Sequence, residues 1–402
     1  MTDASSSFFS PDRRSGLIAL TRFLDRAGRA YASNRNHDHG PGRHDNVSRL
    51  SPWIRHRSLT EEEILKAVLA RHGAHAAEKF IQEVFWRTYW KGWLELRPAV
   101  WTQYQAGLMR ARDDIATQSG LHDRWVSACN GDTGIACLDA WAQELTTTGY
   151  LHNHARMWFA SIWIFTLKLP WELGADFFLR HLLDGDAASN TLGWRWVAGI
   201  QTPGKTYLAR PDNIARYTDG RFAAPQGLAQ SAPPVPAPPV PTPRALPAPV
   251  PIDPKARTGL LITPEDLSPA LLADQLDALS ITPVTTATTT HRQRISPLTV
   301  APHVLSFEND LVQDMRDRWT DRLGFLAPIS DLAEWAAQHQ LDQIVTLWAP
   351  TGPEADALAR LDGPRIVPVM RPYDRRAWPH ATHGFFRFRA QIPTLLDALS
   401  QG

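Results

Sequence analysis

Two stretches of the sequence decide how this chain folds: residues 148–157, TGYLHNHARM, and residues 184–196, DGDAASNTLGWRW. Each stretch places polar side chains at helical spacing beside apolar and aromatic ones. A charge buried beside tryptophan is costly unless it is paired. The polar side chains in these stretches therefore need to pair with one another or with a polar ligand. These side chains are those of Asn153, Arg156, Asp184, Asp186 and Asn190.

A third predicted helix, residues 78–93, repeats this arrangement, because Phe80, Glu83, Arg87 and Trp90 fall on one of its faces. The i,i+4 spacing of Glu83 and Arg87 predicts an ion pair between them. A helical core with a structural salt-bridge network would explain any one of the three helices. Three such helices together, with an anion-binding loop, favour a bound ligand.

That loop lies in residues 31–53, YASNRNHDHGPGRHDNVSRLSPW. Arginines and serines surround a predicted helix start at Ser51-Pro52, where backbone N–H groups and guanidinium forks form a site for an anion such as a diphosphate. The same loop contains residue types that bind metals, but an ordinary Gly- and Pro-rich loop is the favoured interpretation, and no metal site is predicted. These candidate metal ligands are His37, Asp38, His39 and His44.

The prolines divide the chain, because twelve of the 32 lie between Pro225 and Pro254. Proline lacks the N–H and fixes φ, so residues 223–257 are predicted to form an extended, semi-rigid linker. The expected fold class is α plus α/β, with a helical domain at residues 1–222 and a small α/β domain at residues 258–402. Short apolar runs predict parallel strands at 259–263, 344–349 and 365–370, with helices at 305–323, 329–338, 354–361 and 393–399.

The composition limits the class of protein. A net charge of +1 argues against a generally sticky nucleic-acid binder, and the mild positive charge lies in residues 1–222, where any DNA binding is expected. Two cysteines, Cys129 and Cys137, exclude a disulfide framework. The sequence has no run of 18 apolar residues and no signal peptide, which predicts a cytoplasmic protein without a membrane span.

Taken together, the motifs resemble the FAD-binding domain of the DNA photolyase/cryptochrome family. The resemblance covers roughly residues 15–222, and the block from His152 to Trp196 is its most specific part. The matching blocks, in the family's order, are Tyr31-x-x-x-Arg35, Ser48–Pro52, Glu83-x-x-Trp86-Arg87, Thr133-Gly134, Thr148–Asn153, Arg156-Met157, Trp171, Asp184–Asp186, Asn190 and Gly193–Trp196.

The resemblance implies a non-covalent FAD buried among the helices, with Arg156 against the flavin and Asn190 facing its N5 atom. Asp184 and Asp186 would take the ribityl chain and the edge of the flavin ring. The full set of implied FAD-site residues is Tyr31, Arg35, Ser48, Arg49, Leu50, Ser51, Phe80, Glu83, Arg87, Tyr150, Asn153, Arg156, Asp184, Gly185, Asp186, Asn190 and Trp194.

It also implies the activity of a deoxyribodipyrimidine photolyase, in which light drives an electron from reduced FAD into a cyclobutane pyrimidine dimer in DNA. Glu83, Asn153 and Met157 would contact the dimer, and Trp86 and Trp196 would wall its pocket, as suits a flipped-out base. No net redox change occurs, because the electron returns to the flavin.

The tryptophan chain that re-reduces the flavin in the family looks broken here. Trp194 and Trp171 occupy its first two places, but Ile115 stands at the third, where Trp158 or Trp163 would have to substitute.

Three further departures concern the domains and the loops. Family members carry an α/β antenna domain before the FAD domain, whereas here an α/β segment follows the linker, without a recognisable motif for an antenna pigment. His154 stands where a basic residue usually follows the motif's Asn. A Gly expected after the first helical turn is replaced near Arg57.

Two alternatives stay open. One is a cryptochrome-like blue-light sensor without repair activity, favoured by the C-terminal extension and the broken tryptophan chain but disfavoured by the intact lesion pocket. The other is a flavin-binding scaffold, against which the polar residues kept on every flavin-facing helix argue. We expect a monomer whose Pro-rich linker or C-terminal domain is open to a protein partner.

Overall fold

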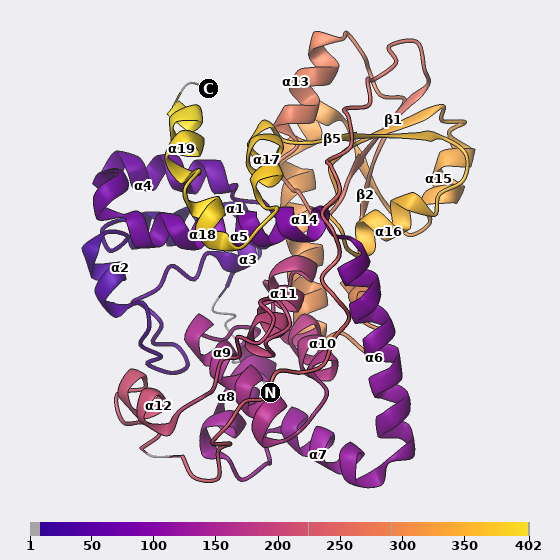
Figure 1. The fold of residues 1–402 in the computed structure, drawn as a ribbon. Coiled ribbons are helices and arrows are strands. Elements are labelled where there is room, and N and C mark those ends of the chain that lie inside the picture. Colours follow the sequence, from indigo (N-terminus) through magenta and orange to yellow (C-terminus); the bar gives the residue numbers. More distant parts are fainter. Residues whose placement is uncertain (1–8, 224, 291, 401–402) are drawn as a thin grey trace, which may run out of the picture.

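The computed structural model describes residues 9–223, 225–290 and 292–400. Its N-terminal part is helical, as predicted, and a five-stranded sheet with flanking helices lies at one end of it (Figure 1). The helices of the N-terminal part are α1 (Arg13–Leu24), α2 (Arg29–Asn34), α3 (Ser51–Arg55), α4 (Glu61–Ala76), α5 (Glu78–Glu95), α6 (Ala99–Thr117), α7 (Ser119–Asn130), α8 (Ala136–Thr148), α9 (Asn153–Ser161), the π-helical turn Ile162–Thr166, α10 (Trp171–His181), α11 (Ala187–Val197) and α12 (Pro211–Tyr217).

Local signals fix where several of these helices begin. Thr60 and Glu63 form a reciprocal capping box at the start of α4, which satisfies two backbone donors that a helix start leaves unpaired. Pro52 stands in the first turn of α3, where its missing N–H costs nothing. Asp186 caps α11 by accepting from the backbone N–H groups of Ala188 and Ser189.

The sheet is entirely parallel, with strand order β3-β2-β1-β4-β5. Three of its strands were predicted, whereas the threonine-rich β2 and the short β3 were not. Its strands and helices are β1 (Thr258–Ile262), α13 (Ala270–Ala278), β2 (Thr285–Thr289), the 3₁₀ turn Arg292–Ile295, α14 (Pro302–Leu323), β3 (Leu326–Ile329), α15 (Leu332–Gln338), β4 (Gln343–Leu347), α16 (Pro353–Ala359) and β5 (Arg365–Val369). The fold class is therefore the predicted one, helical with a small parallel α/β unit.

After β5 the chain returns to the helical part. Helices α17 (Pro372–Ala377), α18 (Phe385–Arg389) and α19 (Ile392–Ser400), with the 3₁₀ turn Trp378–His380, pack against α4 and α5. In Figure 1 the yellow α18 and α19 lie beside the indigo α4. One hydrophobic core runs through the helices and one face of the sheet, and a second, smaller core that includes Leu261, Trp335 and Ile344 lies within the α/β unit.

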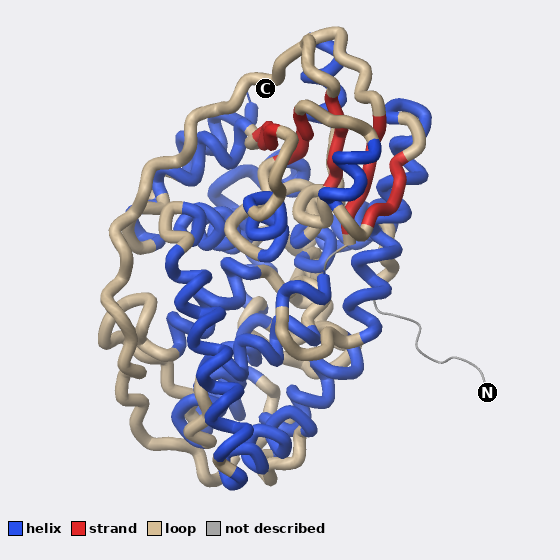
Figure 2. The backbone as a smooth tube through the Cα atoms, turned by 90° about the vertical axis from the view of Figure 1, so that its right-hand side faces the viewer, coloured by secondary structure: helices blue, strands red, loops and turns tan. Residues whose placement is uncertain are grey.

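The proline-rich segment forms neither helix nor strand, as its composition predicts, and runs along one side of the molecule as a long loop (Figure 2). Hydrogen bonds fix it to both parts of the fold. Val235 N donates to Ala198 O at 3.0 Å, and Arg244 N donates to Leu96 O at 2.8 Å. Near the sheet, the Gln343 side chain donates to Asp253 O at 2.7 Å. The segment is thus a docked strap rather than a free spacer.

No helix among the described residues combines the length and the apolar character that crossing a bilayer requires.

Candidate functional site

Helices α5, α9 and α11 meet because α11 packs against both of the others. Each of them buries most of its circumference and leaves one face accessible to solvent. We call these accessible faces together the three-helix surface. Its residues are Glu83, Trp86, Arg87 and Trp90 from α5, Asn153, Arg156 and Met157 from α9, and Asn190, Gly193 and Trp196 from α11. These are residues that the sequence singled out.

The turn before α11 ties the other two helices together. Asp184 accepts two hydrogen bonds from the Arg156 guanidinium, at 3.0 and 2.8 Å. Asp186 lies 2.8 Å from Lys91 Nζ and 3.5 Å from the Arg87 guanidinium. Burial opposes ionisation of Asp186, but the neighbouring cations hold its pKa well below the usual range. The carboxylate of Asp186 is therefore committed to the protein, whereas the Arg156–Asp184 pair borders the accessible surface.

The predicted pair between Glu83 and Arg87 is wrong. Glu83 instead pairs with Arg35, which follows α2, and Arg87 pairs with Glu61 of α4 at 3.2 Å. The i,i+4 contact does not form, because Glu83 is paired with Arg35 after α2 and Arg87 is paired with Glu61 on α4. Burial raises the pKa of Glu83, although Arg35 opposes the shift.

The two tryptophans predicted to wall a lesion pocket are both on the three-helix surface. Trp86 stacks on Phe385 of α18, with ring centroids 3.6 Å apart and planes 12° from parallel. Trp196 packs against Tyr207 at 5.6 Å. The sequence did not point to Phe385, because its contact joins residues nearly 300 positions apart.

The predicted FAD-site residues divide into accessible and buried ones. Tyr31 and Phe80 belong to the core, where their rings meet edge to face at 5.3 Å. Tyr150, Leu50, Gly185 and Trp194 are also buried. The partly accessible members, besides those of the three-helix surface, are Arg35, Ser48, Arg49, Ser51 and Asp184.

The three-helix surface offers polar groups that suit a large aromatic, polar ligand such as a flavin. A Cβ built on Gly193 would meet no atom within 4 Å, so the surface is open between Asn190 and Trp196. The Asn190 amide donates to Ala175 O at 2.8 Å, which leaves its oxygen for another donor. The Ser189 hydroxyl is buried without a hydrogen-bond partner in the described part of the chain. These residues fit the cofactor implied by the resemblance.

Buried aromatic rings continue from the predicted tryptophan chain. Trp171 lies 5.7 Å from Tyr104, which in turn lies 5.2 Å from Trp101. Of the suggested substitutes for the third tryptophan, Trp163 contacts Trp194 at 6.1 Å. The other, Trp158, stacks on Trp141 and His154 instead. Tyr104 and Trp101 were not singled out from the sequence, because they lie on α6, a helix outside the matching motifs.

The histidine-rich loop is anchored by a buried cluster. His44 Nε2 and Glu144 Oε1 are 2.6 Å apart, and Asp38 accepts from Trp141 at 2.9 Å and from Arg221 at 2.6 Å. The cluster fixes the long loop against α8, the helix that carries Glu144 and Trp141. Two other members of the candidate metal set, His37 and His39, pair with the exposed Asp219 instead.

Buried ion pairs join α3 to the C-terminal residues. Arg57, near which the sequence analysis placed the missing Gly, has a left-handed backbone at φ 47° and forms two 2.7 Å hydrogen bonds to Asp374. Such a φ is unfavourable for a residue with a Cβ. The guanidinium therefore compensates a conformation that Gly would adopt without cost. Arg55 reaches Glu265 in the same way, at 2.6 Å.

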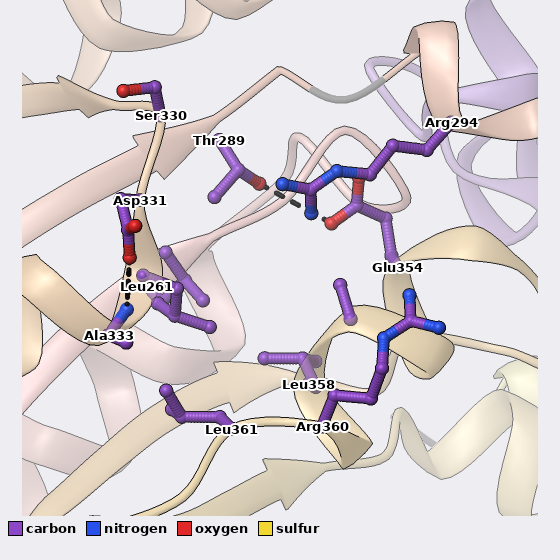
Figure 3. Close-up of a pocket in the computed structure, with 12 residues that line it drawn as sticks. Leu261, Thr289, Arg294, Ser330, Asp331, Ala333, Glu354, Leu358, Arg360 and Leu361 are labelled. Atoms are coloured by element: carbon purple, nitrogen blue, oxygen red, sulfur yellow. Dashed lines mark hydrogen bonds between the residues drawn. The ribbon is translucent and has the colours of Figure 1, made fainter.

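A cavity of about 390 Å³ lies in the α/β unit, at the carboxyl ends of β1 and β2 and beside α15 and α16 (Figure 3). Its polar lining includes Arg294, Asp331 and Glu354. Burial and then the nearby Glu308 and Glu265 raise the pKa of Glu354 to about 8. Doubly wound sheets hold ligands at this edge, yet sequence reasoning missed the cavity because no short motif marks it.

Comparison with known proteins finds relatives for the N-terminal part of the chain. Residues 80–222 match the family described as the FAD binding domain of DNA photolyase. A deoxyribodipyrimidine photo-lyase from Streptomyces griseus is 36% identical over 159 residues, covering 39% of this chain and 33% of that protein. One from Thermus thermophilus is 32% identical over 204 residues, covering 49% of this chain and 45% of that protein.

Among solved structures, a cryptochrome from Synechocystis is 24% identical, with a TM-score of 0.44, and the match covers 55% of this chain and 46% of that one. The chain thus spans less than half the length of the relatives named here. The family match supports the predicted relationship over residues 80–222.

Proposed function

We propose that this protein binds FAD without a covalent bond at the three-helix surface and uses it to split cyclobutane pyrimidine dimers in DNA. One observation carries the proposal. Eight of the side chains that the family resemblance assigns to flavin and lesion binding lie on the accessible faces of three contacting helices, inside the region that matches the FAD binding domain of DNA photolyase: Glu83, Trp86, Arg87, Asn153, Arg156, Met157, Asn190 and Trp196. Reduced FAD, once excited by light, supplies the electron that opens the dimer.

The chain's own residues hold and orient the two bound groups. The Arg156–Asp184 pair offers a fixed cation beside the flavin, and the uncommitted oxygen of Asn190 accepts a hydrogen bond. Ser48, Arg49 and Ser51 supply hydroxyl and guanidinium donors for the diphosphate.

The lesion side uses a carboxyl and an amide. Glu83, which is ion-paired with Arg35 and partly exposed, offers its carboxylate to a pyrimidine N–H in a charge-assisted hydrogen bond. Asn153 is exposed at the start of α9 and presents its amide to the same bases. Trp86 and Trp196 give flat apolar walls against which a flipped dimer stacks.

Light-dependent repair of an oligonucleotide containing one thymine dimer tests the proposal, with the purified protein chemically reduced and lit by blue or near-ultraviolet light. We expect dimer loss only in the light and only with FAD present. Protein that binds FAD and repairs nothing under these conditions would reject the photolyase activity.

The same assay separates a second candidate, a light sensor without repair. The observation that favours it is the aromatic path from Trp171 through Tyr104 to Trp101, whose indole N–H donates to Asp356 of α16 at 3.1 Å. A path that ends against the α/β unit suits signalling between the two parts. Flavin photoreduction without repair, lost in Trp101→Phe, supports the sensor.

A further inference from the structure

Helix α18 is fixed to the helix that carries Glu83 and Trp86. Phe385 stacks on Trp86 at 3.6 Å, and Phe388 packs against Tyr89 at 5.5 Å. The Tyr89 hydroxyl donates to His383 O at 2.8 Å, just before the helix begins. These contacts place α18 along the edge of the three-helix surface, next to one of its tryptophan walls.

The residue that follows the anchored Phe385 lies at the surface instead. Phe386 is 79% exposed, more than any other large hydrophobic residue that the structure describes. Exposing a whole phenyl ring forgoes the free energy of burying it. Its ring is held close to a cation, because the Arg389 guanidinium lies 5.6 Å from its centroid. A rigid, exposed aromatic beside an arginine is a stacking platform for a base.

Four arginines flank Phe386 along the chain, and Glu62 of α4 lies close enough to Arg376 for their charges to interact. Within the described residues, the guanidinium groups of Arg375, Arg376, Arg387 and Arg389 form no ion pair. Two other charged residues in α17 and its preceding turn have buried partners elsewhere in the chain. Arg371 pairs with Asp266, and Asp374 pairs with Arg57. Residues 371–389 therefore carry more positive than negative charge, which suits a polyanion.

We propose that the α17–α18 face is a second part of the DNA-binding surface, in which Phe386 stacks on a base beside the flipped dimer while Arg387 and Arg389 contact phosphates. The inference rests on the proposed function and deepens it by adding a DNA contact from outside residues 1–222, where the sequence analysis expected all DNA binding to lie.

The test measures binding of the full-length, FAD-loaded protein to two duplexes by fluorescence anisotropy across a salt series. The duplexes share one sequence, and one of them contains a single thymine dimer. Phe386→Ala should weaken binding of the dimer duplex about tenfold or more, as loss of a base–aromatic stack does. It should change binding of the undamaged duplex far less. Phe386→Trp should keep the wild-type affinity.

Arg387→Ala with Arg389→Ala should weaken binding of both duplexes and lower the salt slope by about 2, or roughly one per lost phosphate contact. Phe325→Ala is the matched control, because Phe325 is 72% exposed and lies 5.7 Å from the Arg316 guanidinium, but directly before the edge strand β3 of the sheet. It should behave as wild type. The FAD spectrum and the thermal transition should be the same in all variants.

Wild-type affinity of Phe386→Ala for the dimer duplex, in protein that still repairs, would overturn this inference and leave the proposed function standing. Light scattering gives a second check. If the wild-type protein forms a homodimer and Phe386→Ala is a monomer, the inference is overturned as well, because the face would then bind a second copy of the chain. Wild-type protein that binds neither duplex would reject the proposed function and this inference together.

Discussion

Ion pairs build both the three-helix surface and the contact between α3 and the C-terminal residues, yet water reaches only the first. The side chains of Arg35 and Glu83 are each 29% exposed, whereas those of Arg57 and Asp374 are 4% and 1% exposed. A half-exposed pair can exchange a partner for a ligand at little cost, because water and the ligand offer similar hydrogen bonds. A fully buried pair cannot, so its task is to hold the architecture.

The largest effect is expected at the buried contact. Arg57→Ala removes the partner of a fully buried carboxylate, which costs about 3–5 kcal/mol of unfolding free energy. Urea unfolding measures this loss, and Arg318→Ala, which breaks a half-exposed i,i+4 pair with Asp314, serves as the control. A loss below about 1 kcal/mol for Arg57→Ala would show that the buried pair does not hold the two parts together.

The second prediction concerns the exposed pair. Glu83→Ala should lower light-driven repair by about one to two decades, the value of a charge-assisted hydrogen bond. The FAD spectrum and the unfolding free energy should change little, because Arg35 can turn to solvent. Glu78→Ala, on an exposed face of the same helix, is the matched control. Joint loss of FAD and stability in Glu83→Ala would assign Glu83 to the architecture instead.

These two regions also show what the sequence could reveal. Local signals predicted the helix start at Ser51-Pro52, the helical character of the N-terminal part and the apolar strands β1, β4 and β5. Strand β2 was missed because its sequence TTATT is polar although its last four residues are buried. Strand β3 was missed because it is four residues long and contains Pro328.

The partners of site residues were harder to predict than the residues themselves. The motifs identified Glu83, but spacing rules compare only neighbours in the sequence and so paired it with Arg87 rather than with Arg35. Arg57 was noticed only as a departure, because its partner Asp374 lies 317 residues away. Contacts across such distances depend on how the C-terminal helices return, which no local pattern encodes.

A third prediction uses pH to test burial in the α/β unit. The pKa of Glu354 is raised to about 8, so the folded state binds this proton more tightly than the unfolded state does. The stability that Glu354 contributes is therefore complete below its ordinary value near 4.5 and is lost as the pH rises through 8. Glu354→Gln should raise the unfolding free energy by roughly 1–3 kcal/mol at pH 9 and leave it nearly unchanged at pH 5.

The exposed Glu334→Gln is the control for this titration. Equal stability of wild type and Glu354→Gln across the range would mean that water or a cation in the cavity solvates the carboxylate. At acid pH the unfolding free energy should change in the opposite direction. The nearby cations hold the pKa of Glu265 and of Glu61 at about 2, against the effect of burial. Stability from these two carboxylates is present above their ordinary values and is lost as the pH falls toward 2.

The smallest effect on the unfolding free energy is expected in an ion pair that has one exposed and one buried member. Arg244 of the proline-rich strap lies 3.2 Å from Glu95, but its side chain is 50% exposed whereas that of Glu95 is 3% exposed. Arg244→Ala should cost less than about 1 kcal/mol, because surface pairs contribute little and Glu95 keeps the hydrogen bonds from Thr351 N and Oγ1, at 2.8 and 3.1 Å. Glu95→Ala should cost more, because it leaves those buried donors unpaired.

If the two substitutions prove equally mild in urea unfolding, burial does not distinguish architectural from exchangeable charges in this molecule. If Arg244→Ala proves the costlier of the two, the strap stabilises the fold more than its single exposed cation accounts for.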